Sequence, residues 1–121
     1  MEPLQAEDRA ILARGIALFN DGEYFACHEV WEELWKRSSG DARPALQGLI
    51  QAAVALLHGE RGNRRGAMSV YHKAMGNLAK APGDWMGLKL ADLALALREF
   101  FDEPPKRKSS SKRPQIKFDF A

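Results

Sequence analysis

The sequence predicts an all-α protein, a compact, antiparallel-leaning bundle of about five helices that ends in a basic, flexible tail. Apolar residues recur at helical spacing over most of the 121 residues. Short segments rich in Gly, Asn, Asp and Pro interrupt this pattern and leave only short connections, which favour antiparallel neighbours. A strand-like alternation appears only near the C-terminus. We therefore expect one domain, with the bundle over residues 1–103 and the tail over 104–121.

Residues 6–20 form the first predicted helix, because Leu12, Ile16 and Phe19 share one face. Gly15 lies on that same face. A glycine inside a helix costs about 1 kcal/mol relative to alanine, so we expect another helix to approach closely there. The sequence Asn-Asp-Gly at 20–22 ends this helix.

The second predicted helix, residues 23–36, has an aromatic face with polar groups in it. At 100° per residue, one face centres on His28 and includes Tyr24, Phe25, Trp31, Glu32 and Trp35. Glu29 lies at the edge of that face. We expect the aromatic side chains of this face to be buried.

Residues 42–60 form the third and most apolar predicted helix, which should be the most buried. Its inward face is predicted to contain Leu46, Leu49, Ile50, Ala53 and Leu57, and a stripe along one edge to contain Gln47, Gln51, Val54 and His58. Asn63 can cap a fourth helix over 64–80. A fifth helix is predicted over 85–102, with an inward face of Leu90, Leu93, Leu97 and Phe100 or Phe101.

Composition limits the cellular context and the partners. The single cysteine, Cys27, cannot form an internal disulfide, and the acidic N-terminus does not resemble a signal peptide. No apolar run approaches the roughly 20 residues of a membrane span. We therefore predict a cytoplasmic protein without membrane contact. The net charge of +2 arises from the tail, since the body is acidic, so we do not expect the body to bind nucleic acid.

The tail has two parts. From Pro104 it is basic and of low complexity, which predicts a flexible linker. At its end Ile116, Phe118 and Phe120 alternate with polar residues, which is typical of an extended segment. Three apolar side chains on one side can dock on the bundle or on a second copy of the chain, so a homo-oligomer stays open.

Polar residues on the second and third helices are the candidate site. Buried hydrogen-bonding side chains without partners cost about 1–3 kcal/mol each, so these groups should meet one another, water or a ligand. The candidate binding residues are His28, Glu29, Glu32, Gln47, Gln51, His58 and Asn63. They predict either a small-molecule pocket between the two helices or a set of hydrogen bonds with a purely structural role. A third alternative is a protein interaction module without a pocket.

A metal-dependent hydrolase is a further alternative. The segment His28-Glu29-Val30-Trp31-Glu32 departs from the zinc motif H-E-x-x-H at its last position. The di-iron pattern Glu-x-x-His also fails, because Phe25 and Ala55 stand three residues before His28 and His58. What remains is a divalent-metal site, such as zinc, with His28, Glu32 and His58 as ligands and Glu29 as the base.

Aromatic, glycine and polar residues recur in a fixed order over about residues 10–78. They read Phe19-Asn20-x-Gly22-x-Tyr24-Phe25-x-x-His28-Glu29-x-Trp31-Glu32-x-x-Trp35, then Leu46-Gln47-Gly48-Leu49-Ile50-Gln51, His58, Gly62-Asn63 and Gly66-Ala67. This pattern resembles the bacterial and archaeal family known as domain of unknown function 309. The resemblance implies a compact helical bundle, and the label predicted metal-dependent hydrolase is sometimes attached to the family. It implies family positions at Asn20, Gly22, His28, Glu29, Glu32, Gln47, Gln51, His58 and Asn63.

Overall fold

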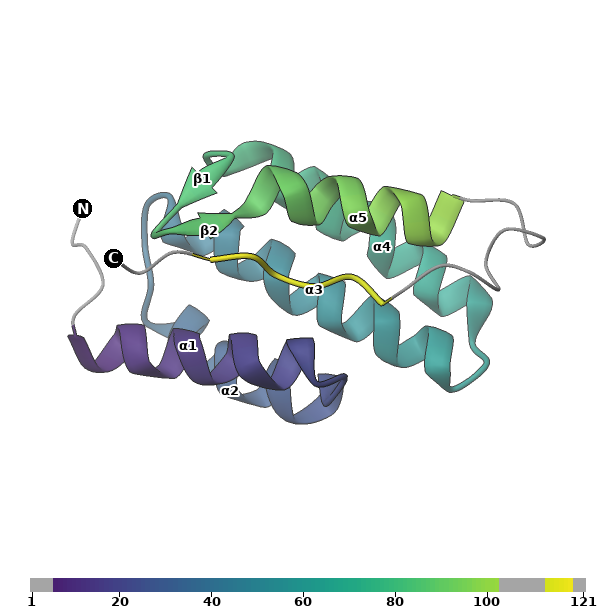
Figure 1. Cartoon of the computed structure of the whole chain (residues 1–121), viewed down its shortest axis with the longest axis horizontal. Coiled ribbons are helices and arrows are strands. Elements are labelled where there is room, and N and C mark those ends of the chain that lie inside the picture. Colours follow the sequence, from purple (N-terminus) through teal and green to yellow (C-terminus); the bar gives the residue numbers. More distant parts are fainter. Residues whose placement is uncertain (1–5, 103–112, 119–121) are drawn as a thin grey trace.

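The computed structural model describes residues 6–102 and 113–118, which form five helices and one short hairpin (Figure 1). This confirms the predicted helical bundle. The elements are α1 (Ala6–Asn20), α2 (Tyr24–Lys36), α3 (Ala42–Glu60), α4 (Arg64–Lys80), β1 (Asp84–Trp85), β2 (Leu88–Lys89) and α5 (Leu90–Asp102). None of the described helices combines the length and the apolar character that crossing a membrane requires.

The predicted stop and cap signals place the ends of the first four helices. Helices α1, α3 and α4 have the predicted bounds, and α2 begins one residue later than predicted. Gly22 and Gly62 follow α1 and α3 with φ angles of 81° and 78°, a conformation that glycine adopts at little cost. The side chain of Asn63 accepts a hydrogen bond of 2.9 Å from the Gly66 N–H and so caps α4, as predicted.

Helix α3 is the centre of the fold. It lies between the α1/α2 pair and the α4/α5 pair (Figure 1). Ten residues of this helix are buried, more than in any other described helix, as its apolar sequence predicts. Its small residues allow close packing, since a Cβ atom on Gly48 would lie 2.8 Å from the side chain of Leu78 on α4.

Helices α1 and α2 approach each other at Gly15, as predicted. A Cβ atom at this position would overlap the indole ring of Trp31. Trp31 is fully buried, and its Nε1–H donates a 3.2 Å hydrogen bond to the carbonyl oxygen of Leu12. The absent side chain of Gly15 therefore provides the space for the indole, which accounts for a glycine in the middle of a helix.

The segment before α5 differs from the prediction. Residues 84–89 form a two-stranded antiparallel hairpin, in which Trp85 pairs with Leu88, instead of the first turns of a helix. Met86 and Gly87 both have positive φ, at 54° and 82°, which matches a type I′ hairpin turn. The leucine spacing that predicts α5 applies only from Leu90 onward, where the inward residues are Leu90, Leu93, Leu97 and Phe101.

Part of the tail docks on the bundle. The side chain of Asn20, at the end of α1, bonds both backbone groups of Ile116: Oδ1 accepts from the N–H at 2.8 Å, and Nδ2 donates to the carbonyl at 3.2 Å. The backbone N–H of Lys89 donates to the carbonyl of Lys117 at 2.9 Å. Residues 113–118 thus run between α1 and α5, in yellow in Figure 1.

This docking corresponds to one of the two predicted alternatives for the end of the tail. Ile116 is 2% exposed, so its side chain belongs to the core. Phe118 remains 51% exposed although it forms a bridge to Leu88. The predicted flexible linker falls almost entirely within residues 103–112, which lie outside the described residues, as does Phe120.

Candidate functional site

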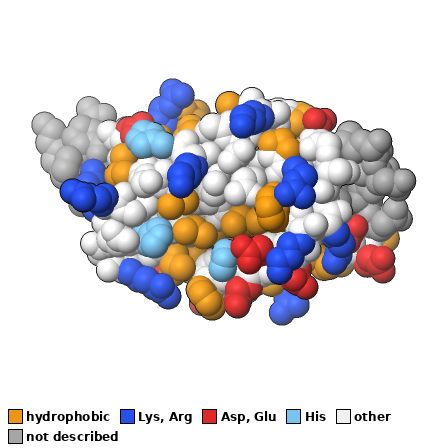
Figure 2. Space-filling model, turned by 180° about the vertical axis from the view of Figure 1, so that it is seen from behind, with side chains coloured by type: hydrophobic (Ala, Val, Ile, Leu, Met, Phe, Trp, Pro, Cys, Tyr) orange, Lys and Arg blue, Asp and Glu red, His pale blue; other side chains and the backbone are white. Residues whose placement is uncertain are grey.

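The residues predicted from sequence to form a site lie on α2 and α3 and in the turn before α4. Figure 2 shows the molecule from the side opposite to that of Figure 1, with histidine side chains in pale blue beside an orange hydrophobic band. His28 and His58 are half-buried, and Glu29 and Glu32 are exposed. His28 lies between two neighbours on its own helix, because Nε2 is 3.7 Å from the Glu32 carboxylate and Nδ1 is 3.4 Å from the carbonyl oxygen of Phe25.

The other predicted residues form separate local contacts. Nδ2 of Asn63 lies 3.3 Å from Nδ1 of His58. Gln51 accepts a 2.7 Å hydrogen bond from Nδ2 of Asn77 on α4. Gln47 lines a shallow hollow whose other walls are Trp35, Arg43, Pro44, Asn77 and Lys80. His58, Asn63 and Gln51 thus have side-chain neighbours, and a ligand-binding role for the predicted residues stays a prediction.

The metal set expected from sequence is not assembled. Among residues 6–102 and 113–118, no three His, Cys, Asp or Glu side chains are placed together to hold a metal ion. His28 and Glu32 are neighbours, but His58 does not complete a three-ligand group with them. The described structure thus gives no support to a metal-dependent hydrolase with these three ligands and Glu29 as its base.

The buried face of α2 is also rotated from its predicted centre. Phe25 is 51% exposed, whereas Cys27 and Leu34 are fully buried beside Trp31. The predicted buried face was the one with the most aromatic residues. The side of α2 that is actually buried is the one that faces α1 and α3. Burial raises the pKa of the Cys27 thiol well above its usual range, so this thiol is protonated at neutral pH.

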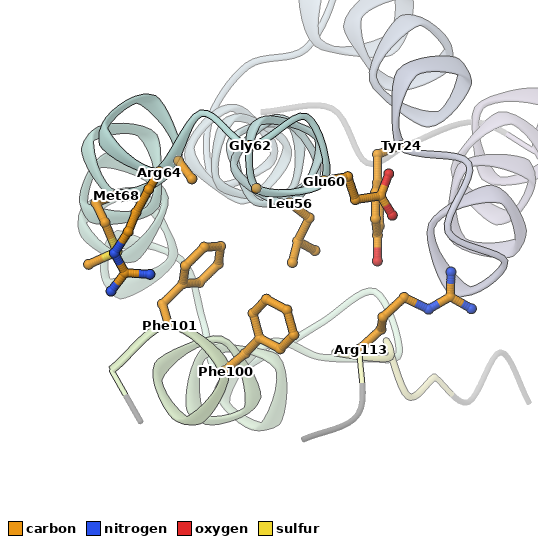
Figure 3. A pocket seen from close by; sticks show the side chains of 11 residues that line it. Tyr24, Leu56, Glu60, Gly62, Arg64, Met68, Phe100, Phe101 and Arg113 are labelled. Atoms are coloured by element: carbon orange, nitrogen blue, oxygen red, sulfur yellow. The ribbon is translucent and has the colours of Figure 1, made fainter. Parts of the chain in front are cut away.

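A cavity of about 370 Å³ lies on another side of α3, where the helix meets α4, α5 and the tail (Figure 3). Residues two positions apart on a helix point about 200° apart, so Leu56 and Glu60 project away from the side of His58. The cavity is lined by Tyr24, Leu56, Gly59, Glu60, Gly62, Arg64, Ala67, Met68, Phe100, Phe101 and Arg113.

Two aromatic rings from the last turn of α5 form one wall of this cavity. The ring of Phe101 stacks on Tyr71 with centroids 4.7 Å apart, and Phe100 meets Phe101 edge-on at 5.3 Å. The hydroxyl of Tyr71 donates a 3.1 Å hydrogen bond to Asp102, which ties the end of α5 to α4. The contacts of Tyr71 with Phe101 and Asp102 thus fix the position of this wall, as is typical of a preformed apolar surface.

Tyr24 lines the cavity and has a buried hydroxyl. The side chain is 2% exposed, and its ring packs edge-on against Phe19 at 5.4 Å. Its hydroxyl oxygen has no hydrogen-bond partner within the described part of the chain. Figure 3 shows this oxygen pointing into the space between Leu56, Phe100 and Arg113. An unpartnered buried hydroxyl costs about 1–3 kcal/mol.

The protonation state of Tyr24 follows from its surroundings. Burial raises its pKa to about 12, Glu60 adds to this increase, and the positive charge of Arg113 opposes it. The hydroxyl therefore carries its proton at neutral pH and can donate a hydrogen bond into the cavity.

Charged side chains surround the mouth of the cavity. Glu60, Arg64 and Arg113 are all exposed, and none of them forms an ion pair within the residues that the structure describes. The guanidinium of Arg113 packs against Gly22 and donates a 3.4 Å hydrogen bond to a neutral oxygen, the carbonyl of Asp21. The cavity therefore joins an apolar interior to a rim with two arginines and one carboxylate.

Sequence reasoning missed this cavity because four separate parts of the chain build it. Phe100 and Phe101 were predicted only as core residues, and Arg113 falls in the predicted flexible tail. Tyr24 was among the residues that carry the family resemblance, but its helical spacing predicts a core aromatic. No local pattern shows that its hydroxyl lacks a partner.

The chain is thus a small helical bundle with a partly open, mostly apolar cavity. Residues 12–70 match the model of the family described as "Domain of unknown function (DUF309)", so the resemblance predicted from the sequence is confirmed over that segment. The matched segment contains Tyr24, Leu56, Glu60 and Arg64 of the cavity, and Phe100, Phe101 and Arg113 lie beyond it.

Two curated relatives are uncharacterised. An uncharacterised protein of Aquifex aeolicus (strain VF5) is 26% identical over 102 residues, covering 84% of this chain and 29% of the relative. The uncharacterised protein YpuF of Bacillus subtilis (strain 168) is 48% identical over 46 residues, covering 37% of this chain and 26% of the relative. The matched region thus spans less than a third of the length of either relative.

Proposed function

We propose that this protein binds a small amphipathic molecule in the cavity between α3, α4 and α5. The observation that carries the proposal is the Tyr24 hydroxyl, which is buried, protonated and unpartnered within the described residues, and which points into a mostly apolar space. A ligand with a polar atom at that point would satisfy the hydroxyl and cover the rings of Phe100 and Phe101. The volume of about 370 Å³ suits a ligand of modest size.

This proposal differs in location from the pocket expected between the second and third helices. There, Gln51 and His58 already have side-chain neighbours, Asn77 and Asn63. At the cavity, the buried hydroxyl of Tyr24 has no hydrogen-bond partner within the described residues. The geometry therefore favours the cavity as the binding site.

A neutral probe tests the binding site. We expect octan-1-ol to bind with a dissociation constant below about 1 mM, which corresponds to about −4 kcal/mol and is within reach of a ligand with nine heavy atoms. Gly59 lines the cavity, and no atom lies within 4 Å of a Cβ built on it. Gly59→Leu should therefore extend into the cavity from a position with open space at Cβ and weaken binding at least about tenfold, as followed by NMR titration.

Gly76→Leu is the matched control. Gly76 is a helical glycine on α4 that also has open space around a built Cβ, but it does not line the cavity. This variant should bind octan-1-ol like the unmodified protein. If the probe does not bind below about 1 mM, or binds both variants equally well, the cavity is not a binding site.

A further inference from the structure

We infer that the ligand of this cavity is an amphipathic monocarboxylate, with its carboxylate at Tyr24 and Arg113 and its apolar chain along Phe100, Phe101 and Met68. This inference rests on the binding function proposed above and adds the chemical class of the ligand. It follows from three features of the described residues: a fixed donor, unpaired cations at the rim and an apolar wall.

The fixed donor is the Tyr24 hydroxyl. Because Tyr24 is 2% exposed and its ring is held against Phe19, the position of its oxygen is set by the core rather than by a mobile side chain. The hydroxyl is protonated, so the ligand atom that meets it accepts a hydrogen bond. Hydrogen bonds to a charged acceptor are about twice as strong as neutral ones, which favours a carboxylate over an alcohol oxygen.

The charges at the rim favour an anion over a cation. Arg113 lies on the same side of the cavity as Tyr24, and Arg64 lies on the opposite side beside Met68 (Figure 3). Glu60 stands near Tyr24 and opposes an anion. Because Glu60 is exposed, its carboxylate can turn toward water, whereas the buried hydroxyl of Tyr24 cannot. An arginine guanidinium can hold a carboxylate through two parallel hydrogen bonds.

The apolar wall receives the remainder of the ligand. Leu56, Ala67, Met68, Phe100 and Phe101 contribute the apolar side chains of the lining, whereas Arg64 lies beside Met68 (Figure 3). Burial of a hydrocarbon chain there contributes roughly 25 cal/mol for each Å² of apolar surface removed from water. The polar end and the apolar interior together match a molecule that has one carboxylate and one chain.

Three eight-carbon probes test the inference. Octanoate, octan-1-ol and octylammonium each have eight carbon atoms and a single polar head group, which is negative, neutral and positive in turn. We expect octanoate to bind the unmodified protein at least about tenfold more tightly than the other two, in calorimetric or NMR titrations at pH 7 and low salt. Equal or tighter binding of octylammonium or octan-1-ol would overturn the carboxylate assignment.

Two substitutions locate the carboxylate. Arg113→Gln should remove most of the preference for octanoate over octan-1-ol, whereas Arg14→Gln, at an exposed position on α1, should preserve it. Tyr24→Phe should weaken octanoate binding about tenfold or more. Its melting temperature should be unchanged or higher, because the substitution removes an unpartnered buried hydroxyl. Unchanged octanoate affinity in Tyr24→Phe contradicts the inference even if the fold is intact.

Failure of the inference is distinguishable from failure of the binding function. If octan-1-ol binds in the cavity and octanoate binds no more tightly, the binding site stands and the carboxylate assignment is wrong. If none of the three probes binds, both are wrong. Glu60→Gln offers an independent check. Removing the repulsion between the carboxylates of Glu60 and octanoate should tighten octanoate binding by up to about fivefold.

Discussion

Gly15→Ala is expected to lower the free energy of unfolding by about 2–4 kcal/mol, although alanine is the better helix former. The new methyl group would overlap the indole of Trp31, which is fully buried and cannot move without disturbing the core. Overpacking of this kind typically costs about 1–3 kcal/mol. A displaced indole would also lose its hydrogen bond to the carbonyl of Leu12 and leave a buried N–H unpaired. Urea denaturation measures the loss.

Gly76→Ala is the control, because the same substitution is expected to raise the stability of the protein at this position. Gly76 is exposed in the middle of α4, with no atom within 4 Å of a built Cβ. Alanine should stabilise the protein there by up to about 1 kcal/mol through helix propensity and the lower entropy of the unfolded chain. A stabilising effect of Gly15→Ala as well would show that α1 and α2 are not packed as closely as described.

Asn20→Ala should release the docked part of the tail and cost about 1–3 kcal/mol of stability. The Asn20 side chain is the hydrogen-bond partner of both backbone groups of Ile116, and alanine leaves both groups unpaired. Because Ile116 is part of the core, loss of its anchor also exposes apolar surface. Amide hydrogen exchange at Ile116 should become much faster, while exchange in the middle of α3 should change only with global stability.

Gln115→Ala is the control for this contact. Gln115 is exposed, and its side chain donates a single 3.1 Å hydrogen bond to the Asn20 carbonyl, a group that water can reach. We expect a loss of less than about 1 kcal/mol. If Asn20→Ala leaves the exchange rate at Ile116 unchanged, Asn20 does not hold the tail.

The sequence predicted the helices well where local chemistry determines them. The Asn-Asp-Gly and Arg-Gly-Asn segments end α1 and α3, and these glycines adopt the positive φ that such ends require. The hairpin at 84–89 was missed because the leucines that follow it continue a helical period. A type I′ turn at Met86-Gly87 is not the usual Asn-Gly or Asp-Gly signal.

The candidate site could be predicted only in part. Helical spacing places Gln47, Gln51 and His58 on one stripe, and the structure agrees that these residues are half-buried. Spacing does not show that Gln51 meets Asn77, or that the empty volume lies on the other side of α3. Those features depend on the tertiary approach of α4, α5 and residues 113–118, so they are visible only once the chain is folded.

Because Cys27 is buried, the labelling of its thiol reports on opening of the core. The thiol is fully buried in a chain with one cysteine, and burial keeps its pKa high, so a thiol-modifying reagent has no reactive group to reach in the folded state. Labelling can proceed only when α2 separates from its neighbours. The rate at which the reagent is consumed therefore measures how often the core opens under native conditions, without an engineered probe.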